Sequence, residues 1–278
     1  MNIKSKFFDA KEITGGNSEK TIVIAGLAGE LCYLLEGRER ALLIDTLAGA
    51  GNLKAFVREL TDLPVTPVLT HGHMDHAGGA FDFASTEIYI HPADIAMVYE
   101  NKVQERIGFV ESTRVREDDF TPPVPLKTIP VYDGHIFDLG GRKIKTIEVP
   151  GHTRGTLVFL DKGIRTVFSG DACNANTLLF LPHAASIEEY KQGLLHFKTF
   201  QSDFDIMYGG HGLFSVPKVI IDEAIELCDD IMEGKDDHIP SEFLGRPCCY
   251  AKKTKEPFRR EDGKIANIAY NKETVFKK

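Results

Sequence analysis

Short apolar runs between polar turns predict most of the β-strands of this chain. Residues 31–37 and 40–46 flank a polar turn at Arg38 and Glu39, and together they predict a hairpin. Further strands are predicted at 64–70, 86–91, 143–149, 156–161, 166–171 and 205–210. Strands are therefore expected in both halves of the chain.

Helical spacing of apolar residues alternates with these strands. Residues 52–60 carry this spacing, and a second helix is predicted at 92–100, where Pro92 lies in the first turn. Ser186, followed three residues later by Glu189, forms a capping box that predicts the start of another helix. A strong amphipathic pattern predicts the last helix at 216–233.

The mixture of strands and helices predicts a layered α/β sandwich. Residues 101–125 are charged and irregular, and we expect a helical or loop insertion there. The sequence holds no internal repeat, low-complexity tract or linker rich in proline and serine. A single domain over residues 1–278 is therefore the simplest organisation.

Composition places the chain among ordinary globular proteins. It is 42% apolar and 27% charged, which excludes a disordered or collagen-like chain. The formal net charge of −8 argues against a general nucleic-acid binder. This charge is uneven, because residues 251–278 carry a net charge of +5. We interpret this basic C-terminal extension either as a solvated edge strand at 265–271 with basic flanks or as a rim that steers an anionic substrate.

The sequence carries no signal for a membrane or an oxidising compartment. No apolar run approaches the roughly 18 residues of a membrane-spanning helix, and the first residues lack the apolar stretch of a signal peptide. The five cysteines are scattered and odd in number, unlike a disulfide framework. We therefore expect a cytoplasmic protein with no membrane or nucleic-acid partner.

The strongest chemical signal is the segment VLTHGHMDHAGG at 68–79. It places His71, His73, Asp75 and His76 directly after a predicted strand. Imidazole and carboxylate groups are ligands for zinc, manganese and iron. Two histidines at positions i and i+2 of an extended chain project to the same side. Because burying four such groups unpaired is costly, the cluster predicts a metal site.

Three more candidate ligands each follow a predicted strand and a glycine. His152 lies in EVPGHTRG, Asp171 in TVFSGDAC and His211 in MYGGHG. Layered α/β folds gather functional groups at the ends of their strands. We therefore expect these three residues to complete the metal site.

With these motifs the sequence resembles the metallo-β-lactamase-fold hydrolases. The resemblance rests on HGHMDH, PGHT, SGD and GGHG in that order, and it covers roughly residues 20–235. It implies a four-layer αβ/βα sandwich with a two-metal site in the cleft between the sheets. By the same resemblance, the first metal would be held by His71, His73 and His152, the second by Asp75, His76 and His211, and Asp171 would bridge the two.

A bridging Asp171 makes the chain similar to the glyoxalase II and lactonase branches of that family. This similarity implies two divalent metal ions, with zinc ahead of manganese or iron. A metal-bridging hydroxide would attack a carbonyl group in a thioester, a lactone or a related ester or amide, and Asp75 would accept or shuttle the proton. Two alternatives stay open, a mononuclear iron oxidoreductase like the persulfide dioxygenases and a phosphodiesterase.

Two irregular segments, 101–125 and 174–183, are the candidate walls of the substrate cleft. Both combine apolar side chains with a few polar ones, as a pocket for a small-molecule substrate requires. The alternative for 101–125 is a contact in a homodimer or a solvated excursion. The candidate substrate-binding residues are Phe109, Asn174, Asn176, Phe180 and His183.

Overall fold

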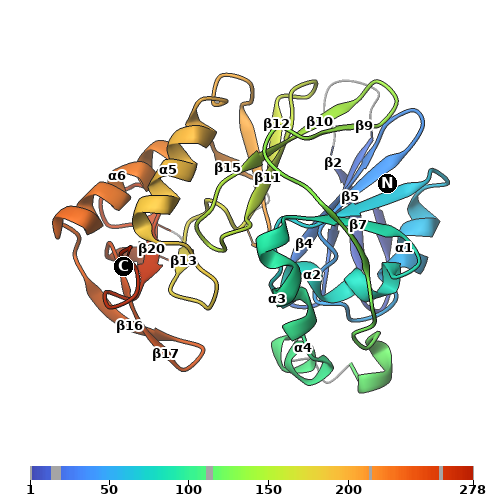
Figure 1. Cartoon of the computed structure of the whole chain (residues 1–278), viewed down its shortest axis with the longest axis horizontal. Coiled ribbons are helices and arrows are strands. Elements are labelled where there is room, and N and C mark those ends of the chain that lie inside the picture. Colours follow the sequence, from blue (N-terminus) through green and yellow to red (C-terminus); the bar gives the residue numbers. More distant parts are fainter. Residues whose placement is uncertain (1, 14–19, 111–114, 213–214, 257–258, 278) are drawn as a thin grey trace.

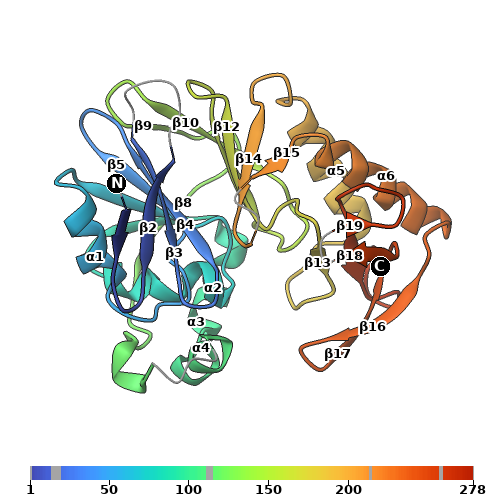
Figure 2. The ribbon, with the colours of Figure 1, turned by 180° about the vertical axis from the view of Figure 1, so that it is seen from behind.

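Two mixed β-sheets lie face to face in the computed structural model of the chain, and helices cover their outer surfaces (Figures 1 and 2). The structure describes residues 2–13, 20–110, 115–212, 215–256 and 259–277. Three apolar cores separate the layers. One fills the space between the two sheets, and one lies beneath each helical layer. Helix, sheet, sheet and helix make four layers, so the predicted α/β sandwich is confirmed.

The first sheet keeps its strands in chain order. Within the described residues it consists of β1 (Asn2–Lys4), β2 (Asp9–Ile13), β3 (Thr21–Ala25), β4 (Leu31–Glu36), β5 (Ala41–Ile44), β6 (Val65–Val68), β7 (Glu87–Ile90) and β8 (Lys127–Pro130). Pairing is antiparallel from β1 to β5 and parallel from β5 to β8. The hairpin predicted around Arg38 and Glu39 is confirmed as β4 and β5.

Helix α1 (Leu53–Leu60) covers the outer face of this sheet and begins at Asn52, whose side chain accepts a hydrogen bond from the Ala55 amide. Its apolar stripe packs into the core of the sheet, as the spacing of 52–60 predicted. The shorter helices that follow are α2 (Met74–Ala77), η1 (Gly78–Phe83), η2 (Pro92–Asp94), α3 (Ile95–Glu100), α4 (Val103–Val110) and η3 (Glu117–Asp119). The last two lie in the predicted insertion.

The second sheet has the strand order β15-β14-β12-β11-β10-β9. These strands are β9 (Ile136–Asp138), β10 (Lys143–Glu148), β11 (Leu157–Asp161), β12 (Thr166–Gly170), β14 (Ile206–Gly209) and β15 (Val216–Pro217). Helices α5 (Ile187–Lys198) and α6 (Ile220–Glu233) cover it, and the capping box of Ser186 and Glu189 is present at the start of α5. None of the helices in the described part of the chain is long and apolar enough to cross a bilayer.

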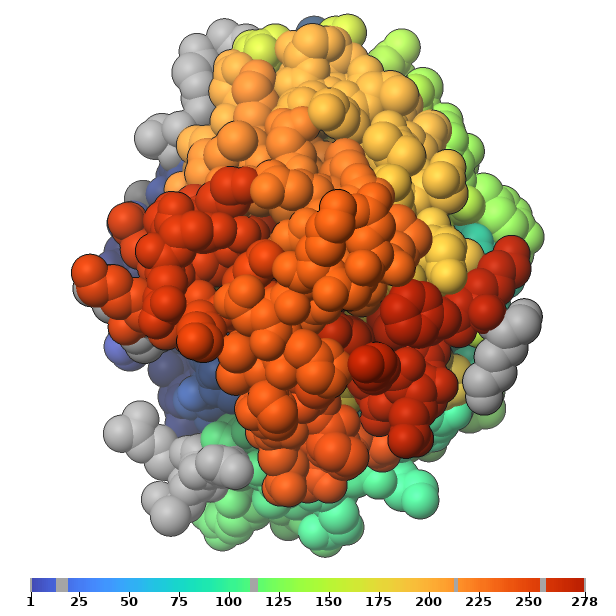
Figure 3. All heavy atoms as spheres, turned by 90° about the vertical axis from the view of Figure 1, so that its left-hand side faces the viewer, coloured from blue at the N-terminus to red at the C-terminus, as the bar shows by residue number. Residues whose placement is uncertain are grey.

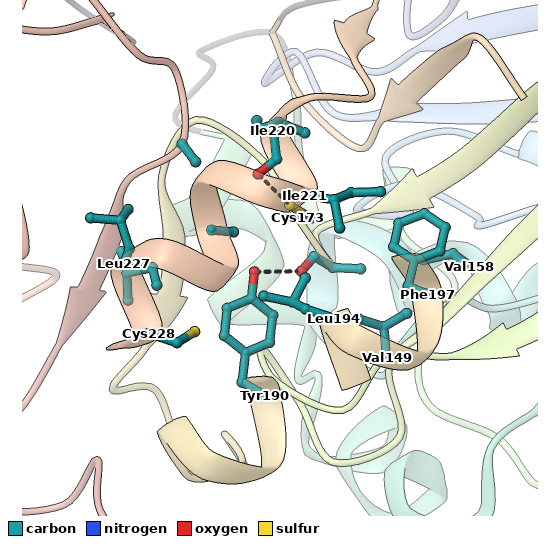
Figure 4. Close-up of a cluster of buried hydrophobic side chains, with 14 of the residues drawn as sticks. Val149, Val158, Cys173, Tyr190, Leu194, Phe197, Ile220, Ile221, Leu227 and Cys228 are labelled. Carbon is teal, nitrogen blue, oxygen red and sulfur yellow. Dashed lines mark hydrogen bonds between the residues drawn. The ribbon is translucent and has the colours of Figure 1, made fainter. Parts of the chain in front are cut away.

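The packing of α5 and α6 fixes the chain that leaves β12. Figure 4 shows Tyr190 of α5 and Ile220 of α6 reaching this chain from its two sides. The Tyr190 hydroxyl donates to the Ala172 carbonyl at 3.0 Å, and the Cys173 thiol donates to the Ile220 carbonyl at 3.7 Å. All these side chains are buried in one apolar core. The candidate ligand Asp171 directly precedes Ala172. The two helices therefore determine its position.

Arg142 ties the two sheets together. Its guanidinium is fully buried and donates to the Asp161 carboxylate at 2.7 Å, which belongs to the second sheet. It also donates to the Thr21 hydroxyl at 2.6 Å and to the carbonyls of Lys20 and Glu36 at 2.9 Å, all on the first sheet. Buried charge is tolerated only when it is paired and hydrogen-bonded, and this guanidinium meets both conditions.

A small C-terminal sheet packs beyond β12. Its order is β13 (Thr177–Leu179), β20 (Ile268–Tyr270), β17 (Arg246–Tyr250) and β16 (Ile239–Phe243), while β18 (Thr254–Glu256) pairs with β19 (Arg259–Arg260). The prediction of a solvated edge strand at 265–271 is wrong, because β20 lies between two other strands and is buried. Its apolar side chains join the core beneath α5 and α6.

The predicted helix at 216–233 begins only at Ile220. Val216 and Pro217 instead form β15, which pairs with β14. Val216 precedes a proline, and the proline ring disfavours helical backbone at the residue before it. The amphipathic pattern was correct from Ile220 onward, but the proline moved the boundary.

The Arg142 contacts predict a large loss of stability when the guanidinium is removed. Arg142→Met should lower the free energy of unfolding by about 3–5 kcal/mol, because Asp161 would then be a buried charge without its ion-pair partner. Urea unfolding followed by circular dichroism measures the change. Arg165→Ala removes an exposed ion pair with Asp205 and is the matched control. Equal midpoints for the two variants would contradict the role given to Arg142.

Candidate metal centre

The structure brings all seven sequence-predicted ligands together at the ends of strands from both sheets. His71 and His73 follow β6, and Asp75 and His76 lie on the short helix α2. The second sheet supplies the rest, in loops after its strands: His152, Asp171 and His211. They form two groups of potential metal ligands, the first of His71, His73 and His152 and the second of Asp75, His76, Asp171 and His211.

The ligand atoms of each group converge. In the first group, His73 Nδ1 lies 2.9 Å from His152 Nε2. In the second, His211 Nε2 lies 3.1 Å from His76 Nε2 and 2.9 Å from Asp75 Oδ2. Within each group all the ligand atoms lie within 4.8 Å of one another. Such spacing between nitrogen and oxygen atoms fits coordination of one cation per group.

Two buried atoms of the site have no hydrogen-bond partner among the described residues. They are His71 Nε2, in the first group, and Asp171 Oδ1, in the second. Buried polar atoms are almost always satisfied, so an unsatisfied pair in one site requires an explanation. A cation bound by each group would satisfy both atoms, and the donor set therefore fits a metal centre.

Asp45 fixes which nitrogen of two histidines is free to bind a metal. A carboxylate only accepts hydrogen bonds, so His76 Nδ1, at 2.8 Å from Asp45 Oδ2, must carry its proton. The Thr70 hydroxyl also donates to Asp45, at 2.8 Å, and so accepts from His71 Nδ1 at 3.0 Å. In both rings Nε2 is therefore the nitrogen that faces the site and would bind a metal.

A backbone carbonyl fixes which nitrogen of His152 carries the proton. Its Nδ1 lies 3.0 Å from the Leu178 carbonyl, which can only accept a hydrogen bond. The proton is therefore on Nδ1, and Nε2 faces the first group with its lone pair. Leu178 belongs to β13, so the small C-terminal sheet also orients a ligand.

The electrostatics of the two groups differ. In the first group burial lowers the pKa of His71 and His152 and lowers the pKa of His73 to about 3. These histidines are neutral at physiological pH, which is the form that binds a metal.

In the second group carboxylates and histidines stabilise each other's charge. Burial alone would raise the pKa values of Asp75 and Asp171, but the neighbouring His76 and His211 hold both below their usual range. Burial would lower the pKa of His211, but the Asp171 and Asp75 carboxylates raise it to about 10. Two ionised carboxylates in a buried site favour the binding of positive charge.

Glycines let the backbone pass close to these ligands. A Cβ atom at residue 210 would lie 2.3 Å from the His76 ring and 2.9 Å from Asp171 Oδ1, so Gly210 is required there. Gly170 has a φ of +49°, and a Cβ on it would lie 2.6 Å from the Thr70 hydroxyl. The glycines of the SGD and GGHG motifs thus leave room for the ligands.

A cavity of about 630 Å³ opens over the ligands. Both predicted wall segments contribute to it, 101–125 through Asn101, Glu105 and Phe109 and 174–183 through several residues. Of the candidate substrate-binding residues, those that line the cavity are Phe109, Asn174, Asn176 and His183. His183 Nε2 lies 3.3 Å from Glu100 Oε2, so the second segment meets the end of α3. Residues 111–114 of the insertion lie outside the described residues.

Phe180 does not line this cavity. Its ring packs edge-on against Phe243, with ring centres 6.2 Å apart. Phe243 and its neighbours Leu244 and Arg246 line the cavity in its place. This third wall was not predicted from the sequence, because the hairpin that carries it follows the last ligand motif.

Asp45 was also missed, and its only sequence signal is a carboxylate at the end of a predicted strand. In the structure it is buried and has a φ of +65°, a conformation that is uncommon for a residue other than glycine. Asp94 is a second residue of the site that was not predicted from the sequence. It is buried and accepts hydrogen bonds from the amides of Gly72 and Gly155 and from the Thr153 hydroxyl, so it holds together the loops that carry His71, His73 and His152.

The fold and the two ligand groups define an α/β sandwich protein of the metallo-β-lactamase type. Residues 25–213 match the family profile described as the metallo-beta-lactamase superfamily. The matched residues make up more than half of the chain, and all seven ligands lie within them. The chain belongs to this superfamily.

Curated relatives match about half of the chain. The human acyl-coenzyme A thioesterase MBLAC2 is 27% identical over 173 residues, which are 55% of this chain and 61% of that protein. An uncharacterized Mycobacterium bovis protein, Mb2612c, is 34% identical over 169 residues, which are 53% of this chain and 69% of that protein. The match to MBLAC2 thus spans about three fifths of the length of that relative.

Solved structures support the fold. A metallo-beta-lactamase from Erythrobacter litoralis has a TM-score of 0.59 and 16% identity and covers 83% of this chain and 100% of its own. The sec-alkylsulfatase Pisa1 from Pseudomonas sp. has a TM-score of 0.58 and 12% identity and covers 77% of this chain and 41% of its own. Identities this low show a shared fold and nothing about the reaction.

The hydrogen bonds of Asp45 predict a loss of metal affinity when the carboxylate becomes an amide. In Asp45→Asn the NH₂ group would oppose a donor in either orientation: the Thr70 amide, which donates to Oδ1, or the Thr70 hydroxyl and His76 Nδ1, which both donate to Oδ2. We expect affinity for zinc to fall by about 10–100-fold. Competition with a chromogenic chelator measures it. Asp133→Asn is the matched control, since Asp133 pairs with His196 on the surface. Unchanged affinity in Asp45→Asn would contradict the assignment.

Proposed function

We propose that this chain is a dinuclear metal-dependent hydrolase that cleaves the carbonyl–sulfur bond of acyl thioesters. The observation that carries the proposal is the convergence of two ligand groups around one carboxylate, Asp171, at the floor of a cavity. His152 Nε2 of the first group and His211 Nε2 of the second lie 3.7 and 3.4 Å from the same atom, Asp171 Oδ2. This arrangement supports Asp171 as the bridge between two cations.

The named relative supports the choice of a thioester. MBLAC2 is described as an acyl-coenzyme A thioesterase, and this chain is similar to it over 173 residues. The cavity supports a substrate with an apolar part, since its lining includes Met74, Met97, Phe109 and Leu178. A lactone or another ester would present the same carbonyl group and is the next substrate class to assay.

The two ligand groups and Asp75 would have different roles in the reaction. Divalent ions held by the two groups would supply a Lewis acid for the carbonyl oxygen and a water of lowered pKa, about 7 for zinc. Asp75 is a ligand candidate that also lines the cavity, so its carboxylate would face both a bound metal ion and the substrate. It is placed to accept a proton from the attacking water and to return it to the leaving thiolate.

The metal count separates this proposal from its main alternative. An oxidoreductase like the persulfide dioxygenases would hold one iron per chain and would consume oxygen. The complete second group of Asp75, His76, Asp171 and His211 favours two ions instead.

Elemental analysis of protein purified without chelator should find close to two transition-metal ions per chain. The physical reason is that each group offers at least three converging ligand atoms, which is sufficient for one tightly held ion. Inductively coupled plasma mass spectrometry, referenced to protein concentration, gives the number. A value of one that added zinc or manganese does not raise would remove the dinuclear proposal.

Replacing Asp75 by Ala should reduce thioester turnover by about 10²–10⁴-fold, the range of a positioned acid–base group. The fold should persist, because Asp75 lies on a short helix at the cavity and outside the apolar cores. Hydrolysis of an acyl thioester, followed with a thiol reagent, measures turnover, and circular dichroism checks the fold. Asp62→Ala is the control at an exposed loop aspartate. Turnover near that of the control would show that Asp75 has no catalytic role.

A further inference from the structure

The tip of the β16–β17 hairpin has a conformation that its own sequence disfavours. Phe243 pairs with Arg246, so Leu244 and Gly245 form a two-residue turn. Their φ values are +51° and +70°, the left-handed backbone of a type I′ turn. Asn-Gly is the preferred sequence for such a turn, whereas a leucine there places its Cβ against the carbonyl oxygen.

Burial does not compensate for this strain. Leu244 is 77% exposed, the highest value among the large apolar side chains of the described residues, and Phe243 is 37% exposed. An exposed leucine in a strained turn gains nothing from the resting fold. Backbone strain of this kind persists where a functional contact depends on it. The tip therefore requires a contact that the folded chain alone does not supply.

The position of the tip identifies that contact. Phe243, Leu244 and Arg246 line the same cavity as the ligands Asp75 and His152. In Figure 3 the hairpin, in orange, extends from the C-terminal part of the molecule toward the teal and green residues around α3 and α4. Across the cavity from the hairpin, Met97 and Phe109 offer further apolar surface. The edge-on contact of Phe180 with Phe243 anchors the tip in this position.

The tip also carries a cation. Arg246 is the one Lys or Arg among the described residues that line the cavity. Its guanidinium takes part in no hydrogen bond or ion pair with any described residue. Glu100 and Glu105 also line this cavity, together with the carboxylate ligands Asp75 and Asp171. A free guanidinium is a good partner for a phosphate or carboxylate, because it can bind either with two parallel hydrogen bonds.

We propose that the hairpin tip is the specificity-determining wall of the site, which selects thioesters that join an aliphatic acyl chain to an anionic carrier. Leu244 and Phe243 cover the acyl chain, and Arg246 binds the negative charge of the carrier. The inference rests on the proposed thioester hydrolysis only for the identity of the reacting bond. The tip lies outside residues 25–213, the part matched by the superfamily profile, so this wall is a feature of the C-terminal part of this chain.

Binding of non-hydrolysable thioether analogues tests the wall separately from the reaction. The probes are S-butyl and S-dodecyl thioethers of pantetheine and of phosphopantetheine, titrated by calorimetry into the full-length, metal-loaded chain. The wild-type protein should bind the dodecyl probe more tightly than the butyl probe, and the phosphorylated carrier more tightly than the neutral one. Loss of both preferences in the wild type would overturn the proposal.

Leu244→Asn is the sharpest variant, because it removes the apolar contact while giving the turn its preferred sequence. Dodecyl binding should weaken by about tenfold, as expected for one uncovered leucine, and butyl binding should change less than twofold. The thermal midpoint should stay the same or rise, which excludes misfolding as the cause. Leu195→Asn alters an exposed leucine of α5 and is the matched control. A dodecyl-to-butyl preference that survives Leu244→Asn would overturn the assignment of the wall.

Arg246→Gln tests the carrier half of the proposal. It should weaken the phosphorylated probes by about tenfold and leave the neutral pantetheine probes within twofold. Equal effects on both carriers would contradict the anion contact. If the wild type binds the probes with the expected preferences but hydrolyses neither butyryl nor dodecanoyl thioesters, then the proposed reaction fails and the wall stands.

Discussion

The buried carboxylate of Asp45 is the constraint on which the metal centre depends. It accepts from the Thr70 amide and hydroxyl and from His76 Nδ1, and through Thr70 it also fixes His71. One carboxylate thus sets the tautomer of one ligand in each group. Asp45 adopts an uncommon backbone conformation at the end of β5, and the three hydrogen bonds account for its retention there.

The site also depends on how the two sheets are held together. Ligands from the first sheet must meet ligands from the second within the span of a metal coordination sphere. Arg142 ties the sheets at one place, and α5 and α6 hold the chain that carries Asp171 at another. A shift of one sheet by an ångström would separate His73 from His152, so rigidity of the sandwich is a functional requirement.

Much of this could be predicted from the sequence, because ligands clustered at strand ends leave a local pattern. HGHMDH and the hairpin around Arg38 are encoded by neighbouring residues, and the structure places both as expected. Asp45 and Phe243 could not be assigned, since their roles depend on contacts with residues far along the chain. The burial of β20 was missed for the same reason, because only its pairing with β13 and β17 distinguishes it from an edge strand.

The residues that could be predicted are the metal ligands, and those that could not include the apolar wall of the cavity. All seven candidate ligands lie inside residues 25–213, where the match to the superfamily extends, and they are the residues that the chemistry of metal binding restricts most. The hairpin at 239–250 lies beyond that part and yet lines the same cavity. Metal chemistry requires fixed residue types at fixed positions, whereas an apolar wall can be built from several elements. A protein of this fold can therefore change its substrate by changing the apolar wall while the metal ligands and the reaction stay the same. The turn at Leu244, with its positive φ, is the part of the wall that we propose selects the substrate here.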